Sequence, residues 1–190
     1  CTLDLSSFYF DIRKDTLYCE SLNSKKRKEC IVILNIILDC LLKWFAPIFV
    51  FTTEEINNLI NKDPKSIHEH LFPEIPKNWE NDELDNKWRQ LFKIKQVANI
   101  AIEEKRSNKE IGSSLEAELK ITMDSKKFKL LNNLDLAEYF ITSKAEKFEA
   151  DSEEELKIEV KKTSGNKCPR CWKILEGQCV RCEKVSLESN

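Results

Sequence analysis

Four cysteines near the C-terminal end are the residues of this chain best suited to do chemistry. They form two Cys-x-x-Cys pairs, Cys168 with Cys171 and Cys179 with Cys182, and seven residues separate the pairs. Each pair forms a tight turn that directs two thiolates to one point, and two such turns supply four sulfurs about 2.3 Å from a zinc ion. Four protein ligands leave no open position for water. The pattern therefore predicts one structural zinc ion.

Two disulfides, a redox pair and an iron–sulfur cluster are the alternatives for these cysteines. A redox Cys-x-x-Cys usually stands alone beside a βαβ unit, and no such unit is indicated here. The segment is too short for an apolar core, so metal binding must supply its folding free energy, on the order of 10–16 kcal/mol for small zinc modules. Four more cysteines are scattered along the chain, and we expect Cys30 and Cys40 to be core thiols in a reducing, cytoplasmic compartment.

Cations and one aromatic residue surround the cysteine pairs: Arg170, Trp172, Lys173, Arg181 and Lys184. In one interpretation the cations offset the negative charge of four thiolates, and Trp172 packs over the turn. In the other, these residues form an RNA-binding face, because aromatic side chains stack on unpaired bases and cations bind phosphates. The chain carries 31 Lys and Arg against 33 Asp and Glu, so nucleic-acid binding must depend on a local patch.

Catalytic motifs are missing from the sequence. It contains 3 glycines, no glycine-rich phosphate loop and no combination of residues that resembles a hydrolytic triad. The only two histidines, His68 and His70, lie in a proline-bounded loop and are interpreted as solvated, with metal binding as the alternative. We therefore expect this chain to bind a partner and to perform no chemistry itself.

Most of the chain before residue 112 has helical periodicity. One helix is predicted from Ser24, as N-cap, to about Ala46, and it is apolar on nearly every face. Polar residues at Asn35, Asp39 and Lys43 argue against a membrane span, since each charge near the bilayer centre costs roughly 2.5–3.5 kcal/mol. Such a helix belongs at the centre of a bundle.

Two further helices and a loop complete the predicted helical part. A capping box at Thr52–Glu55 predicts a helix to about Asn61. Residues 62–80 contain three prolines and are predicted as a loop. A long helix is then expected from Asn81, ended by Gly112.

A different pattern follows Gly112. Residues 115–123 alternate between apolar and polar side chains and predict a strand, and two more strands are expected at Tyr139–Ile141 and at 156–160, with an acidic turn at 150–155. The predicted fold is mainly α. It comprises a partial helical bundle at 1–111, a small mixed α/β domain at 112–163 and a four-cysteine zinc knuckle at 164–190.

Several blocks of the sequence together resemble bacterial isoleucyl-tRNA synthetases, of the class I aminoacyl-tRNA synthetases. The blocks occur in the family's order: Leu5–Ile12, Ala46–Ile48 with Thr52–Ile56, Lys87–Arg89, Ile111–Ala117, Lys167–Trp172 and Cys179–Cys182. Thr16 and Lys95 stand where the family often has Arg, and the gap between the cysteine pairs is shorter than in many relatives.

The resemblance implies a role for the chain. Residues 1–111 would form an anticodon-binding type of helical domain, incomplete at its N-terminus, and the chain would bind tRNA(Ile), but not DNA or a membrane, through Arg170, Trp172, Lys173 and Arg181. The parent enzyme, expected to be a monomer, would attach isoleucine to this tRNA with ATP. Its catalytic and editing domains would precede Cys1, so the fragment alone would be inactive.

Two alternatives stay open. The chain could be a stand-alone zinc-knuckle interaction module without RNA binding, or the corresponding part of a valine, leucine or methionine synthetase. An incomplete bundle would also leave the helix from Ser24 to Ala46 partly uncovered. We therefore expect the fragment to self-associate or to expose an apolar surface along Ile31, Leu34, Leu38 or Leu41.

Overall fold

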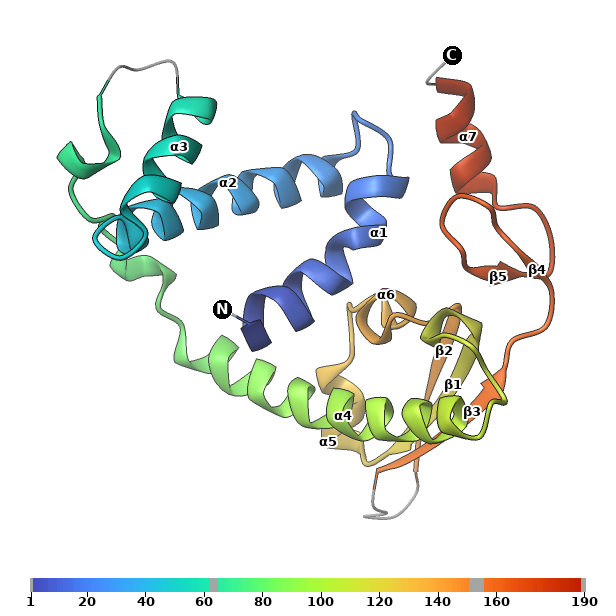
Figure 1. Cartoon of the computed structure of the whole chain (residues 1–190). Coiled ribbons are helices and arrows are strands. Elements are labelled where there is room, and N and C mark those ends of the chain that lie inside the picture. Colours follow the sequence, from blue (N-terminus) through green and yellow to red (C-terminus); the bar gives the residue numbers. More distant parts are fainter. Residues whose placement is uncertain (1, 62–64, 151–155, 189–190) are drawn as a thin grey trace. The chain divides into compact units, whose positions relative to one another are not determined.

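A computed structural model describes residues 2–61, 65–150 and 156–188 of the chain (Figure 1). They form two compact units: Cys1–Ser21 with Asn81–Asn190, and Leu22–Glu80. Helices dominate both units, one small mixed sheet is present, and four cysteines gather near the C-terminal end, which confirms the predicted fold class. The boundaries between units fall inside the predicted 1–111 domain, so the three-part division stays a prediction.

The unit Leu22–Glu80 is a helical hairpin with two short 3-10 turns. It contains α2 (Lys25–Phe45), α3 (Val50–Ile60) and turns at Ile67–Glu69 and Lys77–Trp79. Its small core consists of Leu42, Ala46 and Ile67, with Leu38 and Ile56 packed against them. Helix α2 ends just before Pro47, as predicted from the restricted geometry of a residue that precedes proline.

The predicted capping box at Thr52–Glu55 is wrong. Helix α3 already begins at Val50, and the Thr53 hydroxyl donates to the carbonyl of Phe49 inside the helix, at 2.9 Å. The Glu54 carboxylate instead accepts a hydrogen bond from the Ile67 amide, at 2.9 Å, and so fixes the segment that follows the helix. Ser24 occupies the N-cap position of α2, but its side chain makes no capping hydrogen bond.

Helix α2 is not enclosed. Ile31, Val32 and Ile33 are exposed, whereas Leu34 and Leu41 are half-buried. The apolar surface therefore lies around Ile31, and self-association stays a prediction. None of the described helices combines the length and the apolar character needed to cross a membrane.

The larger unit begins with helices and continues into the sheet. A π-helix (Thr2–Phe10) leads into α1 (Asp11–Cys19), and α4 (Asp82–Ser107) packs against the sheet beside β3 (Figure 1). The Asn81 side chain accepts a hydrogen bond from the Leu84 amide at 2.8 Å, which confirms the predicted start. Gly112 does not end α4. The helix stops at Ser107, and Lys109 takes the left-handed conformation, with φ 59°.

The sheet has the strand order β2-β1-β3. Its central strand β1 (Ala117–Met123) pairs in parallel with β2 (Lys144–Glu149) and antiparallel with β3 (Lys157–Lys162). Two short helices, α5 (Ser125–Leu130) and α6 (Leu136–Phe140), connect β1 to β2. The acidic turn predicted at 150–155 lies, from residue 151 on, outside the described residues.

The strand predicted at Tyr139–Ile141 is wrong, because these residues end helix α6. The Asp135 side chain caps that helix by accepting from the Glu138 amide, at 3.0 Å, and Ile141 ends it in the left-handed region. Strand β2, which was not predicted, lies at the edge of the sheet and has two apolar residues, Ala145 and Phe148, among charged ones. The core beneath the sheet includes Leu91, Ile94, Ala98, Leu119, Ile121, Met123, Leu131 and Phe140.

Candidate metal centre

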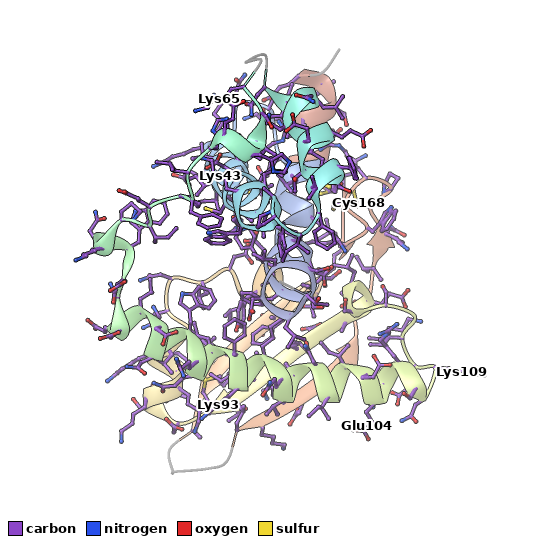
Figure 2. The ribbon with its side chains drawn as sticks, turned by 60° about the vertical axis from the view of Figure 1, so that its left-hand side comes forward. Lys43, Lys65, Lys93, Glu104, Lys109 and Cys168 are labelled. Carbon is purple, nitrogen blue, oxygen red and sulfur yellow. The ribbon has the colours of Figure 1, made fainter. Side chains whose placement is uncertain are left out.

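The four C-terminal cysteines meet at one point. Their sulfur atoms all lie within 4.8 Å of one another, and the Sγ atoms of Cys171 and Cys179 are 3.8 Å apart. A tetrahedral ion with metal–sulfur bonds of about 2.3 Å would separate its sulfurs by about 3.8 Å, whereas a disulfide would join them at about 2.05 Å. The arrangement fits one metal ion with four thiolate ligands. Cys168 is labelled in Figure 2.

A short hairpin and a helix position these ligands. Strands β4 (Asn166–Lys167) and β5 (Ile174–Leu175) pair antiparallel, and α7 (Val180–Glu188) follows. The Cys168 amide donates to the Lys173 carbonyl at 2.9 Å, which closes the first cysteine turn. Gly165 has φ 125°, and a Cβ there would lie 2.3 Å from the Leu175 carbonyl oxygen, so only glycine fits.

The surroundings of the sulfurs differ. Burial raises the pKa of Cys171, Cys179 and Cys182. Burial also acts to raise the pKa of Cys168, but hydrogen bonds from the backbone amides of Cys171 and Arg170 lower it to about 7. Of the four thiols, that of Cys168 is therefore the one whose surroundings favour the thiolate that a metal ion requires.

Arg170 docks the first cysteine turn on the C-terminal end of helix α1. Its Nη1 donates to the Cys19 carbonyl at 2.6 Å, and its Nη2 donates to the Tyr18 carbonyl at 3.1 Å. In return, the Cys19 thiol donates to the Arg170 carbonyl at 3.7 Å. The last carbonyls of a helix lack partners within it and carry partial negative charge, so a guanidinium is well suited to this position.

Arg181 docks the second cysteine turn on the same helix. Its two terminal nitrogens bind both carboxylate oxygens of Asp15, at 2.5 and 2.7 Å, and Nη1 also donates to Glu20 at 3.2 Å. Burial acts to raise the pKa of Asp15, but the Arg181 guanidinium holds it below its usual value. The hydrogen bond to Asp15 raises the pKa of Arg181 in turn. Contacts between residues more than 150 positions apart thus fix the knuckle on α1.

The predicted RNA-binding residues have different surroundings. Trp172 is 60% exposed, has φ 65°, and lies with its ring centroid 5.7 Å from the Lys167 ammonium. Lys173 follows it and is half-buried. The guanidinium groups of Arg170 and Arg181 bind α1. Contact of any of the four with tRNA stays a prediction.

One residue at this centre was not foreseen. Cys19 is buried against Cys168, Cys171 and Cys182, and burial raises its pKa to about 12, so it remains a protonated thiol beside the four ligands. No sequence spacing could have found it, because it comes from α1. Cys30 and Cys40 are buried, as predicted. Among the described residues, the two histidines join no group of metal ligands.

Thr16 and Lys95, the two residues that stand where the resembled family often has Arg, both lie near α6. Thr16 is buried and donates to the Glu138 carboxylate at 2.9 Å, and Arg13 binds the same oxygen at 3.1 Å. Lys95 is buried on α4, donates to the Tyr139 carbonyl and lies 5.0 Å from the Tyr139 ring centroid. Burial lowers the pKa of Lys95 to about 8.

Comparison with known proteins shows the family of the helical part of the chain. Residues 1–121 match the family described as the anticodon-binding domain of tRNA ligase. The chain belongs to this family. Isoleucine–tRNA ligases of Pelagibacter ubique and Agrobacterium fabrum are 54% and 41% identical to it, over 95% and 90% of the chain.

A third relative extends the similarity. The isoleucine–tRNA ligase of Methylacidiphilum infernorum is 39% identical over 97% of the chain. The aligned regions are 20%, 19% and 21% of the three relatives, so the chain spans about a fifth of their length. The similarity thus extends beyond the matched anticodon-binding region toward the cysteine knuckle.

Proposed function

We propose that this chain is the tRNA-binding portion of an isoleucine–tRNA ligase and that its four C-terminal cysteines bind one structural zinc ion. Family membership supports tRNA as the partner, and the names of the relatives support isoleucine as the amino acid. The observation that carries the proposal is Trp172, an exposed aromatic side chain on a rigid cysteine turn.

Zinc is the metal that suits this centre best. Four thiolates at tetrahedral spacing favour zinc or iron, and the four protein ligands leave no open position for a substrate. The ion would supply a cross-link between the β4–β5 hairpin and α7. Elemental analysis of protein purified without added metal should give one zinc per chain. Stoichiometric iron or two disulfides would contradict the proposal.

Trp172 is difficult to explain as a packing residue. A left-handed backbone costs a residue other than glycine roughly 1–2 kcal/mol, and a side chain that is 60% exposed recovers little of this by burial. An exposed aromatic ring beside the Lys167 ammonium, with Lys173 next in the sequence, has the chemistry of a surface that stacks an unpaired base and binds its phosphate. In this proposal Trp172 and Lys173 are the residues that make the direct contacts with tRNA.

Arg170 and Arg181 support this surface indirectly. Both guanidinium groups are bound to α1, so they hold the Trp172 turn in place, and any phosphate contact must share their hydrogen bonds. The parent enzyme would attach isoleucine to its tRNA with ATP in a catalytic domain outside this sequence. Binding of the anticodon end would then orient the acceptor end for that reaction. This chain alone should not catalyse isoleucine-dependent pyrophosphate exchange.

A matched pair of exposed aromatic residues tests the RNA-binding surface. Trp172→Ala should weaken binding of isoleucine tRNA to the full chain by about 1–3 kcal/mol, the range for loss of one aromatic stacking contact. Phe148→Ala removes an aromatic ring that is 40% exposed on β2, lies beside the Lys120 ammonium and falls outside the matched residues 1–121, and it should leave the affinity unchanged. Both variants should keep their zinc. If Trp172→Ala binds tRNA as tightly as the wild type, Trp172 is a packing residue.

A further inference from the structure

A pocket lies between helix α1 and the first cysteine turn. Its volume is 670 Å³, within the range of about 300–1,000 Å³ typical of ligand pockets. Helix α1 contributes Ile12 and Tyr18, the cysteine turn contributes Trp172, and Leu115, Ala137 and Ile141 complete the lining. Tyr18 and Trp172 are 75% and 60% exposed, so two aromatic side chains border the pocket without being packed into the core.

The charges at this pocket leave a positive excess. Each of its three carboxylates is bound to a cation of the chain: Asp11 to Lys14 at 2.6 Å, Asp15 to Arg181 at 2.7 Å and Glu138 to Arg13 at 3.1 Å. The Arg170 guanidinium is bound to backbone carbonyls of α1. The Lys167 ammonium pairs with none of these three carboxylates, whereas Lys173 acts on Asp15 together with Arg181 and adds a second positive charge there. An aromatic, apolar pocket with positive charge at its border complements a base joined to a phosphate.

We propose that this pocket binds one unstacked nucleotide of the tRNA, with its base between Tyr18 and Trp172 and its phosphate near Lys167 or Lys173. The inference rests on the proposed function, because tRNA binding by this chain is its premise. It adds a location and a residue, Tyr18, that neither the cysteine spacing nor the family match indicates.

The pocket is already formed by contacts within the chain. Arg170, Arg181 and the Cys19 thiol hold the two sides together through hydrogen bonds between residues 151 to 166 positions apart. The Ile174 amide also donates to the Ser143 hydroxyl at 2.6 Å, which joins the knuckle to the sheet region. Because the chain has already ordered these groups, a nucleotide can enter without the cost of assembling its site. Arg170 and Arg181 are positioning residues in this arrangement.

Filling the pocket tests the inference. Ala137→Phe places a ring in the lining, and we expect it to weaken binding of isoleucine tRNA to the full chain at least tenfold. Ala150→Phe makes the same change at a half-buried position after β2 that lies outside residues 1–121 and does not line this pocket, and it should alter the affinity less than twofold. Circular dichroism and zinc content check that both variants fold.

A fluorescent base identifies the occupant. In anticodon-loop hairpins that carry 2-aminopurine at one position at a time, one position should be quenched on binding to the wild type, because stacking on an aromatic ring quenches this base. Ala137→Phe should abolish that quenching. If Ala137→Phe does not fold, Tyr18→Ala replaces it, since that side chain is 75% exposed, and a loss of about fivefold or more is expected.

The outcomes separate this inference from the proposed function. Wild-type tRNA affinity and quenching in folded Ala137→Phe, together with weakened binding by Trp172→Ala, would overturn the pocket as a nucleotide site and leave the proposed function intact. If the wild-type chain does not bind isoleucine tRNA, the proposed function fails, and the pocket inference fails with it.

Discussion

The sheet region and the cysteine knuckle belong to one compact unit, yet different forces hold them. Strand β1 buries Leu119, Ile121 and Met123 completely, in a continuous apolar core. Among the described residues of the knuckle, 164–188, Val185 is the one buried apolar residue that is not a cysteine. Four thiols, ion pairs and backbone hydrogen bonds to α1 take the place of a core there. The stability of the knuckle should therefore depend on metal and salt, and that of the sheet on apolar burial.

Metal removal should give the largest difference between the two regions. A chelator, or the Cys168→Ser variant, removes metal-binding free energy on the order of 10–16 kcal/mol from a segment with almost no core. In amide hydrogen exchange, the amides of β4, β5 and α7 should lose their protection, whereas those of β1 should keep it. Unchanged protection of the knuckle without metal would show that its contacts with α1 suffice to fold it.

A cavity in the core should destabilise the sheet region and leave metal binding by the knuckle unchanged. Leu119→Ala removes a side chain with no exposed surface and should lower the free energy of unfolding by about 2–5 kcal/mol in urea titration. Its zinc content should not change, because Leu119 belongs to the apolar core of the sheet and not to the cysteine cluster. Val180→Ala, at a position that is 75% exposed in the knuckle, is the control and should have little effect. Loss of zinc from folded Leu119→Ala would mean that the two regions are not independent.

The same contrast explains what the sequence could predict. The metal centre was predictable because two Cys-x-x-Cys pairs lie within fifteen residues, so local geometry alone brings the ligands together. Strand β1 was predictable because one of its faces is buried. Strand β2 was not, because its edge position leaves most of its side chains charged and exposed.

The contacts of the knuckle with α1 could not be predicted. Arg181 binds Asp15 across 166 positions, and no periodicity or spacing records such a pair. A cation near a metal centre has the same sequence pattern whether it faces RNA or a helix. The capping box failed for a different reason, since α3 already begins at Val50, so that Thr52 and Glu55 lie inside the helix and not at its start.

Lys95 should make the stability of the sheet region depend on pH. Burial lowers its pKa to about 8 in the folded chain, against about 10.4 when unfolded. Between these values the unfolded chain holds a proton that the folded chain has released, so stability should rise with pH, by about 2–3 kcal/mol in total. Lys95→Met should lack this rise.

The control for this prediction is an exposed lysine on the same helix. Lys93→Met, at a position labelled in Figure 2, should keep the wild-type dependence. Urea titrations of the three proteins between pH 7 and 10.5 provide the measurement, and the difference between variants cancels groups that titrate in all of them. Parallel curves for Lys95→Met and the wild type would mean that Lys95 keeps its proton throughout this range.

The smallest effect should come from Arg181, and it tests whether the knuckle is held electrostatically. Arg181→Lys keeps the charge but loses the paired hydrogen bonds with Asp15. In hydrogen exchange, we expect the free energy of opening of the α7 amides to fall by about 0.5–1.5 kcal/mol. Because the Arg181 side chain is 30% exposed, 1 M salt should reduce the difference from the wild type. Arg106→Lys, in an exposed pair with Glu103, should cost almost nothing at either salt concentration. If the cost of Arg181→Lys is unaffected by salt, the geometry of its hydrogen bonds, and not its charge, holds the knuckle on α1.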